Sequence, residues 1–283
     1  MQLLQAHISR RSFAIAAALA VSLALGAHAA LNNRVPDAAK PVAPAQSGDA
    51  AMSASRIALV IGNGHYPDAT APLSQPINDA RALTATLRRN GFDVDVVEDA
   101  SKDDMRRAVG RLKSKITPDS VVMLFFGGYG VQVGRESYMI PVDAAIWREA
   151  DVRRDGFSIE NVLETMKEQG ARAKLAVIDA SRRNPYERRF RAFSHGLAPI
   201  AAPDNALILS SATPGKVADD STGQHSVLMT ELLNNLDAQA GVETVFHKTR
   251  VAISRASDGE QVPAVSSSLV EDVRLGPDEN ASW

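Results

Sequence analysis

From residue 56 onward, short apolar runs alternate with longer amphipathic stretches. One run, FDVDVVED at 92–99, alternates apolar and polar residues and predicts a strand with one exposed face. Another, SVVMLFFGG at 120–128, is the most apolar of the candidate strands and predicts a position at the centre of a sheet. Further strands are expected at IALVIG (57–62), KLAVIDA (174–180), NALILSSA (205–212) and within QVPAVSSSLV (261–270).

Between the candidate strands, apolar residues recur at the spacing of a helix. Ser101 and Asp104 have the spacing of a capping box and predict where one of these helices begins. The stretch VQVGRESYMI, at 131–140, predicts a small hairpin. Helices are expected at 77–91, 101–116, 158–170, 225–239 and 242–257.

The repeated strand–helix–strand order predicts an α/β fold, with one domain built on a mainly parallel central sheet that has helices on both faces. In such sheets, ligand sites lie beyond the carboxyl ends of the strands. Two loops, FFGGYG (125–130) and DASRRNP (179–185), follow the carboxyl ends of expected central strands. We therefore expect them to line one crevice.

The first 29 residues have the order of a secretory signal. Arg10 and Arg11 precede the uncharged run FAIAAALAVSLALG, and small residues follow at Ala27 and Ala29. The SRRSF segment resembles a twin-arginine signal, so we expect cleavage after Ala29 and a periplasmic or secreted protein. The alternative is an uncleaved membrane anchor.

Residues 30–55 are rich in Pro and Ala and predict a disordered linker before a domain at 56–275 and a tail at 276–283. The formal net charge is −2, which gives no indication of a nucleic-acid partner or, beyond the signal, of a membrane partner. The chain has no cysteine, which excludes disulfides and a thiol nucleophile. No cofactor or metal is expected, because the acidic pairs in SKDD and VADD are too short a signal for calcium.

Several separate motifs together resemble one family. They are RIALVIGN, INDAR, an apolar strand followed by a G-x-G loop, YMIPVDA, LAVIDAS, SSATPGKVADD and QVPAVSSSL. Their identity and order resemble the bacterial caspase-like peptidases (peptidase C14, including metacaspases and orthocaspases). The resemblance covers about residues 56–275, and it implies the caspase-like fold and a peptidase-type crevice.

The resemblance also implies where a catalytic pair would stand. The family has a histidine in the G-x-G loop and a cysteine in the loop after the fourth strand, whereas this chain has Tyr129 and Ser181 there. A serine hydroxyl is a poor nucleophile without a base, and tyrosine, which titrates near pKa 10, is a weak base at neutral pH. Losing such groups costs on the order of 10⁴-fold in rate. We expect an inactive dyad.

Other parts of the family's site are implied to persist. The N–H groups of Gly130 and Ser181 are candidates for an oxyanion-hole-like donor pair. Asp79 and Asp179 match the acids that form a pocket for Arg or Lys in metacaspases. Plainer roles remain open, namely helix N-terminal electrostatics for Asp79 and loop hydrogen bonding for Asp179. Relatives often carry an aromatic residue where Ala264 stands.

Few other residues are candidates for a replacement base. His65 follows the first expected strand and is a candidate base or a solvated bystander. His225 is expected to start a helix, while His195 and His247 give no signal. The serines Ser210 and Ser211 end a strand, where serines commonly satisfy backbone groups.

The segment RRNPYERRFRAF (182–193) holds five arginines. Three interpretations stay open: a solvated loop, a tethered decoy in which Arg188 and Arg189 reach the acids, and an anion-binding patch.

Two functions fit this sequence. The first is an inactive caspase-like protein that binds a peptide or protein segment, with an Arg or Lys side chain as the group that the acids would hold. The alternative is a weak serine-type endopeptidase that uses Ser181, with Tyr129 or His65 assisting, and cuts after basic residues. A purely structural relic is a third possibility. Tyr129 either plugs the crevice or lines it.

Overall fold

The computed structural model describes residues 55–67, 72–183, 185–186, 196–218, 223–236 and 239–276. The expected signal peptide, the expected linker up to residue 54 and the expected tail from residue 277 lie outside these ranges. The described residues belong to one compact unit.

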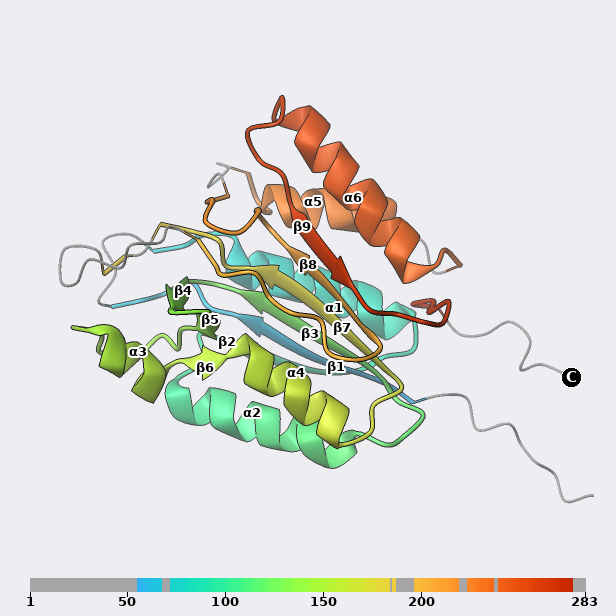
Figure 1. Ribbon diagram of the computed structural model, residues 1–283, viewed down its shortest axis with the longest axis horizontal. Helices are drawn as coiled ribbons and strands as arrows, with labels where there is room; N and C mark the ends of the chain where they lie inside the picture. The colour runs from blue at the N-terminus through green and yellow to red at the C-terminus, as the bar shows by residue number, and fades with distance from the viewer. Residues whose placement is uncertain are drawn as a thin grey trace, which may run out of the picture. The chain divides into compact units, whose positions relative to one another are not determined.

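Strands and helices alternate along this part of the chain much as the hydrophobic pattern predicts (Figure 1). The strands are β1 (Arg56–Gly62), β2 (Asp93–Glu98), β3 (Val121–Gly127), β4 (Gly130–Val133), β5 (Glu136–Met139), β6 (Phe157–Ser158), β7 (Ala173–Asp179), β8 (Ala206–Ser210) and β9 (Ala264–Ser267). The helices are α1 (Pro76–Arg89), α2 (Lys102–Lys115), α3 (Glu149–Asp155), α4 (Ile159–Glu168), α5 (Val227–Asn235) and α6 (Val242–Ala256).

Six of the strands form the main sheet, in the order β2-β1-β3-β7-β8-β9. All neighbours are parallel except β8 and β9, which are antiparallel. Every residue of β3 and β7 is buried, which places the two most important strands for the site in the middle of the sheet. The predicted α/β class, the mainly parallel sheet and the central position of β3 are confirmed.

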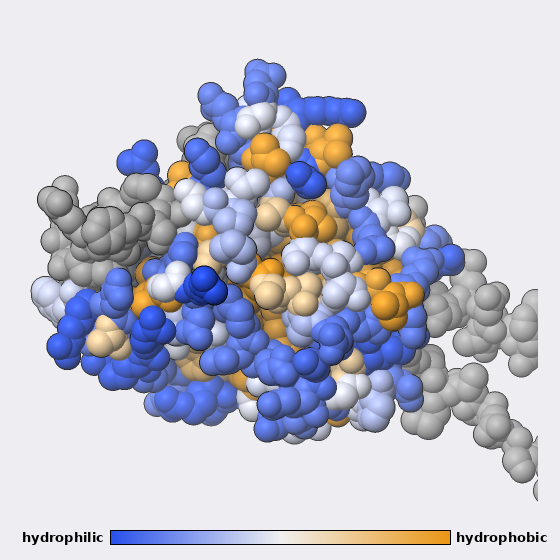
Figure 2. Space-filling model, in the orientation of Figure 1, coloured by the Kyte–Doolittle hydropathy of each residue, from blue (hydrophilic) through white to orange (hydrophobic). Residues whose placement is uncertain are grey.

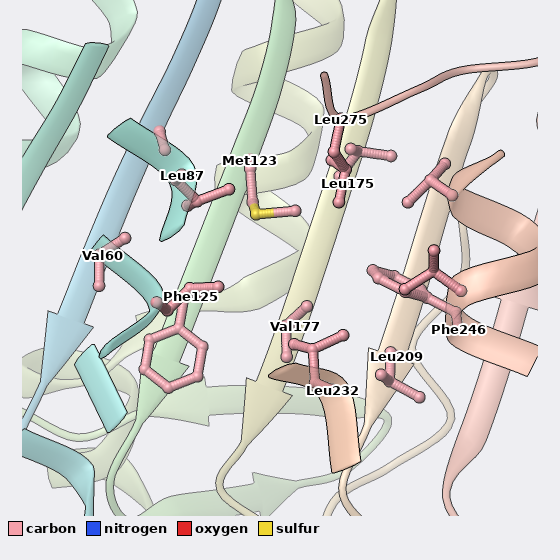
Figure 3. Close-up of a cluster of buried hydrophobic side chains, with 14 of the residues drawn as sticks. Val60, Leu87, Met123, Phe125, Leu175, Val177, Leu209, Leu232, Phe246 and Leu275 are labelled. Carbon is pink, nitrogen blue, oxygen red and sulfur yellow. The ribbon is translucent and has the colours of Figure 1, made fainter. Parts of the chain in front are cut away.

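Helices cover both faces of this sheet (Figure 1). On one face, α1, α5 and α6 pack on a cluster of buried apolar side chains. Figure 3 shows Leu232 of α5 and Phe246 of α6 beside Val177 and Leu209 of the sheet. On the other face, α2 and α4 pack on a second cluster. Burial of one such large apolar side chain contributes about 1.5–3 kcal/mol, so the two clusters supply much of the driving force for folding.

A second, three-stranded sheet in the order β4-β5-β6 lies beside the main one. The predicted hairpin corresponds to β4 and β5, and α3 contacts β4. Neither α3 nor β6 was expected from the sequence. Helix α3 has seven mostly charged residues and β6 only two residues, so neither carries a hydrophobic repeat that reveals it.

The ends of two helices matter for the site. The first turn of α1 lies against the carboxyl end of β1, because a Cβ on Gly62 would lie only 2.5 Å from the Pro76 carbonyl oxygen. Helix α5 begins after Ser226, whose hydroxyl accepts a hydrogen bond from the Met229 amide. This helix is shorter than the predicted 225–239, since Leu236 already has an extended backbone.

The first and last described parts of the domain are joined directly. The Arg56 guanidinium at the start of β1 donates a hydrogen bond of 2.6 Å to the Gly276 carbonyl oxygen. Across the described ranges, none of the helices has the length and apolar character needed to cross a membrane.

Candidate functional site: the carboxyl edge of the main sheet

The two loops that were expected to share a crevice lie side by side. Gly127 at the end of β3 pairs with Asp179 at the end of β7. Beyond that point, the Gly128 amide donates to the Asp179 carbonyl at 3.2 Å, and the Gly130 amide donates to the Ala180 carbonyl at 3.1 Å. The predicted meeting of the two loops is therefore confirmed.

Tyr129 is packed into a cluster of aromatic and apolar residues. Its side chain is only 7% exposed, and its ring meets that of Tyr66 edge to face with the centroids 4.9 Å apart. The Tyr66 hydroxyl accepts from the Tyr129 amide at 3.0 Å and donates to the Ile140 carbonyl at 3.0 Å. Tyr186, also buried, belongs to the same cluster. Burial raises the pKa of the Tyr66 hydroxyl above its ordinary value, so this residue is no base either.

Ser181 lies beneath the surface at the position of the nucleophile. The residue is 1% exposed, and its hydroxyl oxygen has no hydrogen-bond partner in the described part of the chain. Its backbone is held on both sides, because its amide donates to the Ser211 hydroxyl at 3.4 Å and its carbonyl accepts from the Ala218 amide at 2.6 Å. A serine that contacts no base has no route to the alkoxide that attack requires.

The glycines between β3 and β4 have a packing role. A Cβ on Gly128 would lie 2.6 Å from the Tyr66 hydroxyl, and one on Gly130 would lie 2.6 Å from a Leu197 methyl. These glycines let the tyrosine cluster and the loop at 197 approach the backbone closely. The expected donor pair needs correction, since the amides of Gly130 and Ser181 are directed at Ala180 and Ser211 and are not both free for an oxyanion.

Asp179 ends β7 with its side chain 3% exposed. One carboxylate oxygen lies 3.5 Å from the Arg182 guanidinium, and the other, Oδ2, is buried and has no hydrogen-bond partner in the described residues. The Arg182 guanidinium also donates to the carbonyls of Gly128 and Asp179. Arg182 is thus a buried cross-link between the loops, which corrects the interpretation of the whole segment as solvated.

Asp79, in the first turn of α1, is fully buried. It accepts a hydrogen bond from the Ser226 amide at 3.2 Å, and its Oδ1 lies 2.8 Å from His225 Nδ1. Burial, and then repulsion from Asp179, raise its pKa to about 6, against the opposing effect of the bonds from His225 and Ser226. The two acids therefore influence each other electrostatically, and their role as a pocket for a basic side chain stays a prediction.

His65 lies away from Ser181. Its Nδ1 is 2.6 Å from Asp99 Oδ2, and its side chain is 73% exposed. Asp99 follows β2, whereas Ser181 follows β7, and β1 and β3 lie between those two strands. Neighbouring strands are about 4.8 Å apart, so β2 and β7 are separated by about 14 Å. The candidate base and the candidate nucleophile do not meet.

The remaining candidates have separate places. His225 precedes the helix it was expected to start, and its contact with Asp79 was not predicted. His247 is exposed on α6. Ser211 binds backbone groups, as expected for a serine at a strand end. His195, Arg188 and Arg189 fall outside the described residues.

The acids of SKDD have partners of their own. Asp103 pairs with Arg106, and Asp104 pairs with Arg107 and closes the predicted capping box with Ser101. In the ranges the structure covers, no three His, Asp or Glu side chains are grouped as metal ligands. The VADD acids lie outside those ranges.

Ala264, at the start of β9, lines a hollow of about 200 Å3 on the sheet surface together with Leu197 and Ile208. No aromatic side chain lines this hollow. In Figure 2, apolar residues gather in the middle of the visible face, between polar margins.

Comparison with known proteins agrees with this geometry. Residues 55–274 match the peptidase C14 caspase-domain family. Mucosa-associated lymphoid tissue lymphoma translocation protein 1 of Homo sapiens is 28% identical over 143 residues, which are 50% of this chain and 17% of that protein. Its homolog in Mus musculus is 27% identical over 137 residues, which are 48% of this chain and 16% of that protein.

Each match spans less than a fifth of the relative's own length. The family match covers most of this chain and includes both loops, the acid pair and the strand that carries Ala264. The chain belongs to the peptidase C14 caspase-domain family.

Proposed function

We propose that this protein is a non-catalytic caspase-domain protein that binds a peptide or protein segment through an Arg or Lys side chain. The observation that carries the proposal is a contrast among the described residues: the buried Ser181 hydroxyl has no hydrogen-bond partner, and the acid pair Asp79 and Asp179 is buried without full compensation. The first feature removes cleavage, and the second favours a bound cation.

The surroundings of Tyr129 and Ser181 in the described part of the chain support the first half. At the base position, Tyr129 packs against Tyr66, and the candidate replacement base, His65, pairs with Asp99 on the other side of β1 and β3. An activated nucleophile and its base together contribute about 10⁶-fold to the rate in a serine peptidase. At the two dyad positions, Ser181 has a hydroxyl in place of the thiol, and Tyr129 stands in place of the imidazole base.

The acid pair supports the second half. Among the described residues, Asp179 Oδ2 is a buried carboxylate oxygen without a hydrogen-bond partner, and burial, followed by repulsion from Asp179, raises the pKa of Asp79. Removing a charged oxygen from water without a hydrogen bond is costly, so such an atom is stabilised by any donor that reaches it. A guanidinium supplies both positive charge and paired N–H donors.

The peptide-binding experiment uses three labelled peptides of one sequence with Arg, Lys or citrulline at the test position. Citrulline keeps the shape of Arg without its charge. Fluorescence anisotropy should show Arg bound at least tenfold more tightly than citrulline, since hydrogen bonds to charged groups contribute about 1.5–3 kcal/mol. The Asp179→Asn variant should lose this preference. The matched control is Asp204→Asn, which changes a carboxylate that is 89% exposed. Equal binding of Arg and citrulline would contradict the proposal.

A peptidase assay tests the alternative function. Fluorogenic peptides ending in Arg, Lys or Asp are incubated with the protein, with and without calcium, beside a Ser181→Ala variant. We expect no cleavage above that of the variant. Cleavage that disappears in Ser181→Ala would instead make the protein a serine-dependent endopeptidase.

The site of action in the proposal is the periplasm or the cell exterior, reached through a twin-arginine-like signal at residues 1–29. The supporting feature is the order of Arg10–Arg11, apolar run and small residues. Cell fractionation of the full chain and of an Arg10→Lys/Arg11→Lys variant tests it. Retention of the variant in the cytoplasm is expected, and equal export of both would contradict the signal.

A further inference from the structure

The four residues before α5, 223–226, lie across the first turn of α1 and are called the strap here. All four bond to residues of α1 or to the residue just before it. The contacts are Gln75 Nε2 to the Gly223 carbonyl (3.3 Å), Asn78 Nδ2 to the Gln224 carbonyl (3.2 Å), His225 Nδ1 to Asp79 Oδ1 (2.8 Å) and the Ser226 amide to Asp79 Oδ2 (3.2 Å). These bonds hold the strap against Asp79, one of the two acids of the proposed binding site.

His225 is the strap residue that lies between this acid and solvent. Its side chain is 26% exposed, whereas the carboxyl group of Asp79 is 1% exposed. Asp179, whose repulsion acts on Asp79, is buried as well. A basic side chain that approaches Asp79 Oδ1 from the side of His225 therefore competes with the imidazole for this oxygen.

We infer that His225 is the specificity-determining residue of the acid site: it occupies Asp79 in the unliganded protein and is displaced by the bound basic group. The inference rests on the proposed function. Displacement of His225 breaks its bond to Asp79 Oδ1. The net binding free energy of a ligand is therefore only the amount by which its own contacts exceed the bond that is lost. Such a site binds a strong hydrogen-bond donor more tightly than a weak one.

The chemistry of the two basic side chains then predicts a preference. A guanidinium has five N–H donors in a fixed plane, so it can replace the imidazole at Asp79 and bind both oxygens of a carboxylate with paired N–H groups. A Lys ammonium is a compact point charge, strongly hydrated, and offers less paired geometry. The strap therefore selects Arg over Lys, and removing the imidazole should relax that selection.

The test measures binding of the Arg, Lys and citrulline peptides to the full chain, to His225→Ala and to His247→Ala. His247 is an exposed histidine on α6 and serves as the matched control. We expect His225→Ala to bind the Arg peptide about tenfold more tightly. The variant has no imidazole bond to Asp79 that the ligand must break, and one charge-assisted hydrogen bond corresponds to about this factor. The Lys peptide should gain more than the Arg peptide, and His247→Ala should bind both as the unmodified protein does. Unchanged or weaker binding by His225→Ala, at an unchanged Arg-to-Lys ratio, would overturn the inference.

A second measurement does not depend on the variant folding. Imidazole signals of the unmodified protein are followed by NMR during titration with the Arg peptide. The signals of His225 should shift in proportion to occupancy, while those of His247 stay in place. A His225 that keeps its signals at saturating peptide remains on Asp79, and that result would also overturn the inference.

The two proposals fail in different ways. If Arg is preferred to citrulline and Asp179→Asn abolishes the preference, the proposed binding function is supported. If His225→Ala then binds the peptides as the unmodified protein does, only the inference about His225 is overturned. If neither the unmodified protein nor His225→Ala distinguishes Arg from citrulline, both proposals are overturned together.

Discussion

Two regions at the carboxyl edge of the main sheet, a packed half around Tyr129 and a charged half around Asp79 and Asp179, differ in how well their buried polar groups are satisfied. Around Tyr129, where a base would act, the space is filled by packed rings, and the polar groups of Tyr66 are satisfied. Around Asp79 and Asp179, two buried acids repel each other, and Asp179 Oδ2 has no hydrogen-bond partner among the residues that the structure describes. The first region is packed like an ordinary hydrophobic core, whereas the second keeps an electrostatic cost, and such a cost marks the region where a ligand is expected.

The largest expected effect breaks the packed half. Replacing Tyr129 by Ala removes a buried ring from the tyrosine cluster and should destabilise the protein by about 3–5 kcal/mol. Urea unfolding followed by circular dichroism measures the change. The control Tyr129→Phe keeps the ring and should lose less than half as much. A Tyr129→Ala variant as stable as the unmodified protein would show that the ring is not part of the core.

The second largest effect concerns the charged half and is a dependence of protein stability on pH. The pKa of Asp79 is about 6 in the folded protein and lies near 3.8 for an ordinary aspartate, so the folded state binds this proton more tightly. The stability that Asp79 confers is therefore present at pH below about 4 and is lost as the pH rises through 6. For a shift of two pKa units the loss is about 3 kcal/mol.

Urea unfolding at several values between pH 4 and 8 checks this. The Asp79→Asn variant should lack that fall in stability, and Asp204→Asn, a change at an exposed carboxylate, should keep it. Parallel pH profiles for the unmodified protein and Asp79→Asn would show that Asp79 titrates normally.

The smallest effect lies at the boundary between the halves. The Ser181 hydroxyl is buried without a partner, so Ser181→Ala removes an unsatisfied polar group and should stabilise the fold by about 1 kcal/mol. A rise in the thermal unfolding midpoint measures it, with Ser210→Ala at the end of the next strand as a comparison. A lower midpoint for Ser181→Ala would mean that the hydroxyl has a bond of its own in solution.

Much of the scaffold was predictable because its signal is local. The strands β3 and β7 are buried on both faces, so each appears in the sequence as a continuous apolar run. The meeting of their loops followed from parallel topology alone. By contrast, α3 depends on its contact with β4 and on side-chain ion pairs, which leave no repeat in the sequence.

The site was predictable in its residues but less so in its contacts. The positions of Tyr129 and Ser181 followed from the motifs around them, whereas the joint role of Asp79 and Asp179, inferred from the resemblance, stays a prediction. The contact between His225 and Asp79 joins residues 146 positions apart, and nothing near either residue signals it. Arg182 seemed solvated because arginines surround it in sequence, yet carbonyl groups of two loops hold it inside.

The bond between Arg56 and the Gly276 carbonyl joins residues 220 positions apart. Strand β1 therefore completes its native contacts only when almost the whole domain is available, and β8 gains its outer neighbour, β9, just as late. Contacts of such long range slow folding, because the entropy of closing the loop is lost before the contact forms. A chain shortened by a few dozen residues at its carboxyl end lacks both closures, so we expect the domain to reach its native state only after its synthesis is complete.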